Sequence, residues 1–583
     1  MNIQYLLLQR VHEALTLINT KSFLNLIQVQ QSNHIRFGDY QINGMINISK
    51  HLQIPIKDFS NIFIKTINLK GIAKIIKFEP PGFINIFLSP TWIENKINHI
   101  IDLPKLGIDL IPSKNIVIDY SSPNIAKEMH VGHLRSTIIG DSIARILSFL
   151  GHNVIRSNHI GDWGTQFGML IAYIKKHKIN YLSLNDSQQI SMLEYYYQES
   201  KKEYDSDPNF AELSRKYVVK LQKGDVYCRK IWKYLVDISI SNNQKIYDRL
   251  NVTLKKKDIM GESMYHDMLP YIITDLKNKK LAVTSDHATI VFLNQNKNSK
   301  KNNPFGVIIQ KKDGGYLYST TDIACIKYRC ETLHADRIIY YIDSRQKQHL
   351  MQAWEIAYQA GYITKAVVFE HHVCGMLLDK NKKPFKTRSG NTIKLITLLN
   401  EAFNKAYNLI LNKNLNLEYK KINHLAHIIS IGAIKYSELS KNRTTNYIFN
   451  WDKILNFDGN TAPYIQYAYT RISSIFKKIN HRSELQEKKY QIFLSSQEEI
   501  LLAICLLQFH ETLITVADRG TPHILCGYLY KLSTLFSLFY EHCPILKTEC
   551  TYTKYSRLKL SFITAQILKK GLNLLGIETS EYM

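Results

Sequence analysis

The chain has 583 residues, too many for one hydrophobic core, and 45% of them are hydrophobic, so we expect several domains. Its 75 Lys and Arg residues exceed its 49 Asp and Glu residues, which leaves a net charge of +26. That excess permits a polyanionic partner such as nucleic acid, although a biased genome composition would produce the same excess.

The eight cysteines form no C-x-x-C pair, no secretory signal begins the chain, and no apolar run reaches membrane-spanning length. These features disfavour a disulfide scaffold, structural zinc and a membrane-spanning protein. We expect a cytoplasmic protein without a membrane partner. A monomer is expected because no coiled-coil heptad run is evident.

Residues 1–108 mix helical and strand patterns without a catalytic-looking cluster, which predicts an accessory α+β domain. Its clearest features are FGDYQ at 37–41, a turn at Pro80–Gly82 and the strand pattern FINIFL at 83–88. Gly38 and Asp39 are also an ordinary turn pair.

Residues 115–150 predict a strand, a loop and a helix in that order. NIVIDY at 115–120 is rich in β-branched residues, and Leu134 begins an apolar pattern with helical spacing that runs to Leu150. In a parallel α/β sheet such a loop faces the ligand crevice, and the first N–H groups of the helix point toward a bound phosphate.

The tetrapeptide His130-Val131-Gly132-His133 lies at this junction. Its two imidazoles, three residues apart, can share one face and donate hydrogen bonds to phosphate oxygens. Gly132 has no side chain to block a nucleotide ring. The alternative is that the histidines simply satisfy the end of the helix.

A second strand is predicted at 152–156, closed by Gly161-Asp162-Trp163-Gly164, and residues 169–257 predict a helical insertion. ATIVFL at 288–293 and GVIIQK at 306–311 predict a hairpin that leads into the next helix. Tyr318 and Asp322 lie four positions apart at the start of that helix, so they can line one pocket. In isolation an Asp there is more often a helix cap, and Thr320 or Thr321 also suits capping.

IIYYI at 338–342 predicts a buried strand, and the chain after residue 390 predicts helices. Residues 391–457 predict a helical connector, and residues 458–583 predict an all-helical domain. Tyr467, Tyr469, Tyr528 and Tyr530 are candidates for stacking on single-stranded bases. At helical spacing the same rings are often core residues.

These motifs resemble the bacterial arginyl-tRNA synthetases, which are class I aminoacyl-tRNA synthetases. Ser122, Pro123, Asn124, Lys127 and LRSTIIGD at 134–141 carry the resemblance, which covers nearly the whole chain. It implies an N-terminal tRNA-contacting domain at 1–108, a Rossmann-type parallel-sheet catalytic domain at 109–390 and a helical anticodon-binding domain at 458–583. The four-letter signature of the last domain is absent, because Ser561-Phe562-Ile563-Thr564 stands there.

The resemblance also implies roles for individual residues. Selecting arginine calls for carboxylates that accept paired N–H bonds and for an aromatic surface. Glu262, Tyr318 and Asp322 match the arginine pocket of the family. Ser122, Asn124 and His133 match residues that hold the α-ammonium and carboxylate end, and Gln346 matches one that reaches the amino acid or adenosine.

The second class I signature corresponds to Pro384–Gly390 (PFKTRSG). It departs from the common lysine-methionine-serine-lysine-serine form, because Ser389 and Gly390 follow Arg388 where a second lysine is expected. We expect Lys386, Arg388 and Lys127 to balance charge on the triphosphate. A basic loop of this kind is otherwise a solvated surface.

The resemblance implies ATP-dependent activation of L-arginine and its transfer to the 3′ end of tRNA(Arg), with Mg²⁺ accompanying ATP and no zinc. Members of this family generally need bound tRNA before they activate the amino acid. Two alternatives are a small-molecule nucleotidylyltransferase, which needs no anticodon-reading domain, and a non-enzymatic RNA-binding paralogue, which is expected to lose site residues.

Overall fold

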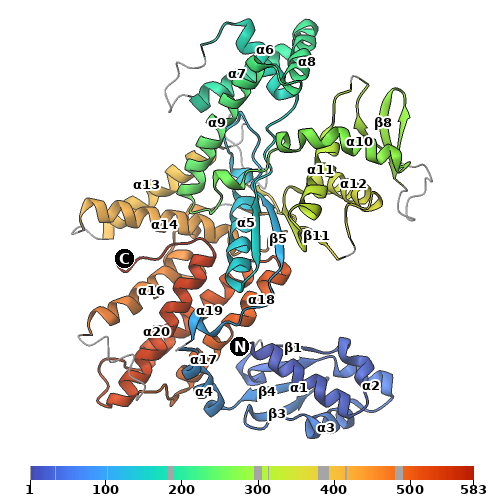
Figure 1. Cartoon of the computed structure of the whole chain (residues 1–583). Helices are drawn as coiled ribbons and strands as arrows, with labels where there is room; N and C mark the ends of the chain where they lie inside the picture. The colour runs from blue at the N-terminus through green and yellow to red at the C-terminus, as the bar shows by residue number, and fades with distance from the viewer. Residues whose placement is uncertain are drawn as a thin grey trace. The chain divides into compact units, whose positions relative to one another are not determined.

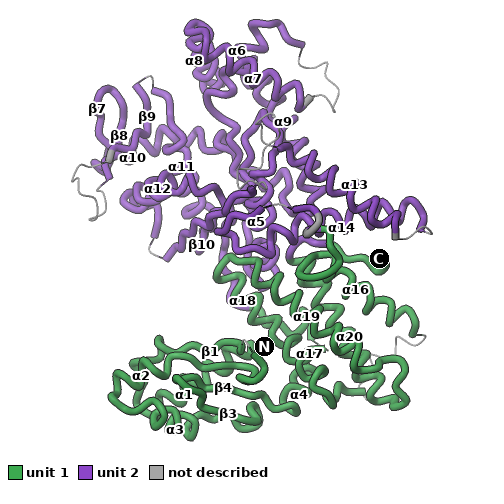
Figure 2. The backbone as a smooth tube through the Cα atoms, turned by 180° about the vertical axis from the view of Figure 1, so that it is seen from behind, with its two compact units in different colours: residues 1–110, 455–574, 578–583 green, residues 111–454, 575–577 purple. Residues whose placement is uncertain are grey.

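The computed structural model describes residues 2–32, 34–101, 103–180, 189–293, 305–312, 314–364, 366–378, 393–413, 417–448, 450–479 and 490–583. They form two compact units (Figures 1 and 2). The first comprises residues 1–110, 455–574 and 578–583, and the second residues 111–454 and 575–577. The first unit therefore combines the two ends of the chain.

The N-terminal part of the first unit is an antiparallel sheet with helices, which confirms the α+β prediction. The strand order is β1-β2-β4-β3, and β4 is the predicted strand Phe83–Leu88. The other elements are α1 (Ile3–Leu17), β1 (Gln28–Gln31), β2 (Tyr40–Asn43), α2 (Met45–Leu52), α3 (Ile56–Thr66), β3 (Ala73–Glu79) and α4 (Pro90–Ile101).

The FGDYQ segment forms a turn and anchors this sheet. Gly38 has a φ of +80°, and a Cβ there would lie 2.6 Å from the Ile86 carbonyl oxygen. Asp39 accepts a hydrogen bond from the Leu88 N–H at 2.7 Å. Tyr40 is fully buried and donates to Glu511 at 2.9 Å. These residues therefore have structural partners, as the turn interpretation predicts.

The C-terminal part of the first unit is helical, as predicted. Its helices are α16 (Ala462–Lys477), α17 (Gln497–Leu507), α18 (Phe509–Arg519), α19 (His523–His542) and α20 (Thr551–Leu574). Among the described residues, the stretch Gln497–Arg519 is long and apolar enough to cross a membrane, which the sequence analysis did not expect. It is 78% buried inside the protein, the arrangement of a core helix.

The second unit is built on a parallel sheet of order β11-β10-β5-β6. The strands are β5 (Asn115–Tyr120), β6 (Asn153–Ser157), β10 (Arg337–Tyr341) and β11 (Val368–His371). Ile116, Val117 and Ile118 are at most 1% exposed, as expected for a strand covered on both faces. Because every pairing is parallel, the carboxyl ends of all four strands share one edge.

Helix α5 (Val131–Leu150) follows β5 and packs against it (Figure 1). A Cβ on Gly140 would lie 2.4 Å from the Cβ of Tyr120, so glycine permits this close approach of helix and strand. The strand-loop-helix prediction is confirmed, with the helix beginning inside the HVGH tetrapeptide.

The helical insertion is present and begins slightly earlier than predicted. Its helices are α6 (Thr165–Lys176), α7 (Gln189–Ser206), α8 (Pro208–Gln222) and α9 (Val226–Arg249). They share a core in which Phe167, Leu170, Phe210 and Ile231 are at most 2% exposed. The insertion therefore has its own hydrophobic centre.

Along the chain, the remaining elements of the second unit lie between the strands of the parallel sheet or after its last strand. A three-stranded antiparallel sheet of order β7-β8-β9 includes the predicted hairpin. Helix α11 begins at Tyr318, as predicted. The elements are α10 (Leu269–Asn278), β7 (Ala282–Ser285), β8 (Ala288–Leu293), β9 (Phe305–Gln310), α11 (Tyr318–Glu331), α12 (Lys347–Gln359), α13 (Leu395–Lys413) and α14 (Tyr419–Leu439).

Candidate active site

Three loops at the carboxyl edge of the parallel sheet bring the predicted site residues together. The loop after β5 contains Ser122 and leads to the HVGH turn, and the loop after β6 contains His159. The loop after β10 contains Gln346. Bridges between Asn124 and Gly161, and between Asn158 and Ile259, connect the first two loops to each other and to the segment before Glu262.

The two histidines of the HVGH turn both accept backbone hydrogen bonds through Nδ1. His130 Nδ1 accepts from the Gly132 N–H at 3.1 Å, and His133 Nδ1 accepts from the His130 N–H at 3.2 Å. The two rings lie 4.0 Å apart. Because Nδ1 accepts, a neutral ring carries its proton on Nε2 and can donate it to a ligand. Capping and ligand binding are therefore compatible roles.

Both of these histidines favour the neutral form. Burial lowers the pKa of His130, and the charges of Lys127 and Arg345 lower it further. Burial also lowers the pKa of His133, to about 4. Near pH 7 the turn therefore supplies hydrogen-bond donors, and the cationic charge for a phosphate has to come from other residues.

Gly132 fits the ring of His130 closely. A Cβ there would lie 2.8 Å from Cε1 and 2.9 Å from Nδ1 of that ring. The glycine thus accommodates the capping histidine, in addition to the predicted role of leaving room for a nucleotide.

Helix α7 of the insertion contacts two lysines, Lys127 and Lys394, which lie next to the described segments that form this turn. Lys127 Nζ lies 4.4 Å from the ring centroid of Tyr197. Lys394 pairs with Glu128 at 2.8 Å and with Glu194 at 3.1 Å. Glu194 and Tyr197 are three residues apart, so they share a face of α7. Lys386 and Arg388 lie outside the described residues.

The two predicted arginine-binding carboxylates are electrostatically coupled through His159. The Nε2 atom of His159 lies 3.7 Å from Asp322 Oδ1. Burial raises the pKa of Glu262, His159 opposes the rise and Asp322 and Asp162 add to it, so that the pKa is about 7. Burial alone would lower the pKa of His159, but Cys325, Asp119 and Asp322 raise it to about 10. At neutral pH the cluster of Glu262, Asp322 and His159 therefore retains protons, chiefly on His159.

Asp322 also has a partner on α12. His349 Nε2 forms a hydrogen bond with Asp322 Oδ2, and the two side chains are 20% and 23% exposed. The ring of Tyr318 lies edge-on to His349 at 4.5 Å and is otherwise exposed. Tyr318 and Asp322 thus contact the same imidazole.

The threonines of YSTTD do not cap α11. Thr320 donates to the Ile309 carbonyl and is fully buried, and the N-cap residue Leu317 makes no side-chain cap. Asp322 lies in the second turn and accepts from an imidazole, so the capping alternative is wrong for these residues.

Ser122 lies in a loop with unusual backbone geometry. Ser121 and Ser122 have φ of +72° and +45°, a region that non-glycine residues seldom adopt. The Ser122 N–H donates to Asn158 at 3.1 Å, and its hydroxyl donates to Asp119 at 3.0 Å. Asp119 pairs with the fully buried Arg329 of α11, so one network connects the β5 loop with the helix that contains Asp322.

Asn124 and Gln346 are exposed at the same edge. Sequence reasoning missed His159, His349, Lys394 and Tyr197. Two signals were available: His159 lies two residues before the GDWG turn, and His349 follows Gln346 by three residues, about one helical turn. Tyr197 and Lys394 are brought to the turn by tertiary structure alone.

The four predicted tRNA-binding tyrosines of the first unit divide into two pairs. Tyr469 and Tyr528 are 7% and 6% exposed, and Tyr528 donates to the Cys505 carbonyl. Their rings are therefore too buried to stack on RNA bases. Tyr467 is 42% exposed, and Tyr530 is partly exposed with its ring 5.6 Å from Tyr464. The guanidinium of Arg471 lies 5.0 Å from the Tyr467 ring.

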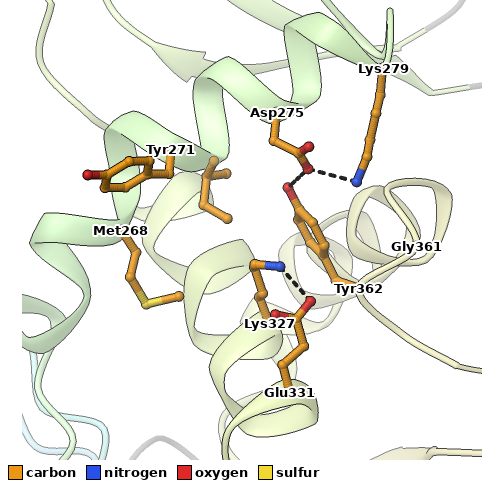
Figure 3. A pocket seen from close by; sticks show the side chains of 9 residues that line it. Met268, Tyr271, Asp275, Lys279, Lys327, Glu331, Gly361 and Tyr362 are labelled. Carbon is orange, nitrogen blue, oxygen red and sulfur yellow. Dashed lines mark hydrogen bonds and ion pairs between the residues drawn. The ribbon is translucent and has the colours of Figure 1, made fainter.

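A cavity of about 390 Å³ lies beside α10 and α11, away from these loops in sequence (Figure 3). Its charged groups are paired with one another: Lys279 with Asp275 at 2.8 Å, and Lys327 with Glu331 at 2.5 Å. The hydroxyl of Tyr362 donates to Asp275 at 2.5 Å. The remaining lining residues are Met268, Tyr271, Ile272 and Gly361. We assign no ligand to this cavity.

Comparison with family models covers most of the chain. Residues 97–451 match the model described as tRNA synthetases class I (R), catalytic domain. Residues 2–88 match the arginyl tRNA synthetase N terminal domain, and residues 465–583 match the DALR anticodon binding domain. The last match holds although the four-letter signature is absent from the sequence.

Relatives match over their whole length. The arginine–tRNA ligase of Blochmanniella pennsylvanica is 67% identical over 583 residues, and that of Pectobacterium carotovorum is 56% identical over 585, each covering 100% of both chains. The structure of arginyl-tRNA synthetase from Plasmodium falciparum has a TM-score of 0.84 and 33% identity, covering 100% of this chain and 99% of that one. The Thermus thermophilus arginyl-tRNA synthetase, 20% identical with a TM-score of 0.80 and 100% of both chains covered, has the same fold. The chain belongs to the arginyl-tRNA synthetases of the class I aminoacyl-tRNA synthetases.

Proposed function

We propose that the protein activates L-arginine with ATP to arginyl-adenylate and transfers the arginyl group to the 3′ end of tRNA(Arg). The observation that supports this most strongly is the coupling of Glu262 and Asp322 at a sheet edge that also carries the HVGH turn. A cationic side chain and an anionic triphosphate thus have complementary surroundings at one edge of the sheet.

The guanidinium of arginine binds to Asp322 and Glu262, with Tyr318 covering one face. Paired N–H bonds to a carboxylate select the planar guanidinium over the compact ammonium of lysine. Ser122, Asn124 and His133 hold the α-ammonium and carboxylate end of the substrate. Gln346, at the end of the β10 loop, contacts the amino acid or adenosine.

The triphosphate binds at the start of α5. His130 and His133 donate from Nε2, and Gly132 leaves room for the nucleotide beside them. Lys127, Lys386 and Arg388 balance the phosphate charge, and Mg²⁺ enters with ATP. The arginine carboxylate attacks the α-phosphorus in line and pyrophosphate leaves, so no protein nucleophile is required. Positioning and stabilisation of phosphate charge therefore account for catalysis.

The tRNA binds through both parts of the first unit. The exposed ring of Tyr467, with Arg471 beside it, and the partly exposed Tyr530 are positioned for stacking on anticodon bases. The N-terminal α+β domain contacts the outer corner of the tRNA. We further propose a cytoplasmic monomer whose arginine activation requires bound tRNA.

The first experiment is aminoacylation of tRNA with a panel of amino acids. Arginine alone should be attached to tRNA(Arg). A nucleotidylyltransferase would not charge tRNA, and a non-enzymatic paralogue would bind tRNA without consuming ATP. Arginine-dependent ATP–pyrophosphate exchange should appear only with cognate tRNA, and robust exchange without it would contradict the tRNA requirement.

A further inference from the structure

The loop after β5 has an unusual backbone, and helix α9 of the insertion holds it at two points. Ser121, Ser122 and Ala126 have φ of +72°, +45° and +65°. The Ala126 N–H donates to the Ser239 hydroxyl of α9 at 3.1 Å. The Ser121 hydroxyl lies 2.7 Å from the hydroxyl of Tyr247, in the last turn of α9. Residues keep such backbone angles only where the surrounding contacts hold them.

The hydroxyl of Tyr247 is the middle of a buried chain of hydrogen bonds. On one side it accepts from the Asn158 side-chain amide at 3.2 Å. Beyond Ser121, the Thr137 oxygen lies 2.9 Å from the Ser121 oxygen and 2.6 Å from the His133 carbonyl oxygen. The four side chains of this chain are at most 6% exposed, so loss of one partner leaves a buried polar group unpaired.

The two ends of this chain determine the direction of every donation. A carbonyl oxygen only accepts, so the single hydroxyl hydrogen of Thr137 points to His133, and Ser121 donates to Thr137. Because Ser121 has no second hydrogen, Tyr247 is the donor between these two hydroxyls. Burial raises the pKa of Tyr247 to about 12, so the phenol keeps the proton that it donates. Each hydroxyl therefore donates once and accepts once.

The same groups connect three parts of the proposed site. The side-chain oxygen of Asn158 accepts from the Ser122 N–H at 3.1 Å, and the Asn158 backbone pairs with the segment that precedes Glu262. At the other end of the chain, the His133 carbonyl belongs to the HVGH turn. The side chain of Tyr247 is 3% exposed, so it acts on the site through these neighbours and does not touch the substrate.

We infer that Tyr247 is a positioning residue for arginine activation, whose hydroxyl holds the loop after β5 so that Ser122 and Asn124 can receive the α-ammonium and carboxylate end of arginine. The carboxylate at that end is the group that attacks the α-phosphorus, so a displaced loop misplaces the nucleophile. This inference rests on the proposed function, because the arginine contacts of Ser122 and Asn124 belong to it.

The test is steady-state aminoacylation with Tyr247→Phe, which removes one oxygen and keeps the buried ring. The KM for arginine should rise about tenfold, because Asn158 and Ser121 lose their common partner and the loop is no longer held. The KM for ATP should stay within twofold of wild type. An unchanged KM for arginine, or an equal rise in both KM values, would overturn the inference.

A matched control is Tyr362→Phe. The side chain of Tyr362 is also 3% exposed, and its hydroxyl also donates a hydrogen bond, to Asp275 on α10. This variant loses a comparable buried hydroxyl outside the loops of the site, so both KM values should remain those of wild type. A rise in the KM for arginine equal to that of Tyr247→Phe would show a general loss of stability and would overturn the inference.

A double-variant cycle with Ser121→Ala separates positioning from independent damage. Ser121→Ala breaks the same chain at the next hydroxyl, so it should raise the KM for arginine by a similar factor. The double variant should stay within about twofold of the weaker single variant, since both changes interrupt one chain. Two factors that multiply would show that the hydroxyls act independently, which would overturn the inference.

Thr137 provides a rescue measurement that remains informative if Tyr247→Phe does not fold. Thr137→Val removes the hydroxyl at the end of the chain and should raise the KM for arginine about tenfold. Thr137→Ser keeps the hydroxyl and should stay within twofold of wild type, and equal values for the two variants would overturn the inference. Failure of the wild-type protein to charge tRNA with arginine would instead contradict the proposed function.

Discussion

The HVGH turn and the Glu262–Asp322 cluster lie at the same edge of one sheet, yet their histidines differ in charge. Burial favours the neutral form at both places. His130 has Lys127 and Arg345 as neighbours, which lower its pKa further, whereas His159 has Cys325, Asp119 and Asp322, which raise its pKa to about 10. The neighbouring charges therefore decide the outcome, and residue type and burial alone do not.

The difference matches the two substrates. A triphosphate brings its own negative charge, so neutral imidazole donors can bind it while lysines supply the cations. A guanidinium brings positive charge, so its site needs carboxylates that remain compensated until it arrives. Each half of the site is thus prepared for a ligand of the opposite charge.

The largest expected effect comes from Asp322→Asn. A neutral amide cannot pair with a guanidinium, so kcat/KM for arginine should fall about 100-fold or more, while the KM for ATP stays within twofold. Steady-state aminoacylation measures both. Asp237→Asn is the control, because Asp237 pairs with Lys256 on the exposed insertion and should behave as wild type. Unchanged arginine kinetics in Asp322→Asn would show that Asp322 does not bind arginine. The contrast between a phosphate-binding HVGH turn and a guanidinium-binding Glu262–Asp322 cluster would then fail.

His130→Ala should have the next largest effect. Loss of one donor to developing phosphate charge should lower the rate of arginine activation about 30- to 100-fold, measured by pyrophosphate exchange with tRNA present. The affinity for tRNA, measured by filter binding, should change less. A collapse of tRNA binding instead would make the HVGH turn an RNA-docking element.

A second variant separates the two roles of His130. In His130→Asn the amide oxygen replaces Nδ1 as the cap for the Gly132 N–H, but the Nε2 donor is absent. Activation should therefore be as low as in His130→Ala. The thermal midpoint should remain near wild type, whereas the alanine variant loses about 1 kcal/mol of helix capping.

The comparison also shows what sequence reasoning can supply. Helix α5 and strand β5 are predictable because local periodicity determines them, and the HVGH turn follows from their junction. The charge states of the histidines are not predictable, since His159 meets Asp322 only when the β6 loop and α11 come together. Likewise, the sequence offers the same residue type at positions 467 and 469 of α16. In the structure Tyr467 faces solvent, whereas Tyr469 is buried in the core.

A smaller effect is expected from Tyr197→Leu. The ring holds Lys127 by a cation–π contact at 4.4 Å, and such contacts contribute about 0.5–1 kcal/mol at exposed sites. Loss of this positioning should raise the KM for ATP about threefold without changing the KM for arginine. Tyr197→Phe keeps the ring and should behave as wild type. Equal effects of the two variants would assign the role to the hydroxyl and not to the ring.

The smallest effect on activity is expected from Glu370→Gln, which tests a carboxylate outside the site. Glu370 pairs with Arg337 at 2.8 Å and with His372 at 2.6 Å. Burial opposes ionisation of Glu370, but these partners lower its pKa to about 2. Burial also lowers the pKa of His372, so at neutral pH that ring donates as a neutral group and Arg337 supplies the charge.

The sign of the pH dependence distinguishes this carboxylate from Glu262. A lowered pKa stabilises the fold above the ordinary value of 4.5, and this contribution, about 1–3 kcal/mol, is lost as pH falls toward 2. Glu370→Gln should therefore lower the thermal midpoint at pH 7 and have less effect at pH 3.

The pKa of Glu262 is raised to about 7, so its stabilising contribution is present below pH 4.5 and is lost as pH rises through 7. At pH 7.5 Glu262→Gln should keep or raise the midpoint while lowering arginine use. A lower midpoint in Glu262→Gln at that pH would make Glu262 a structural carboxylate like Glu370.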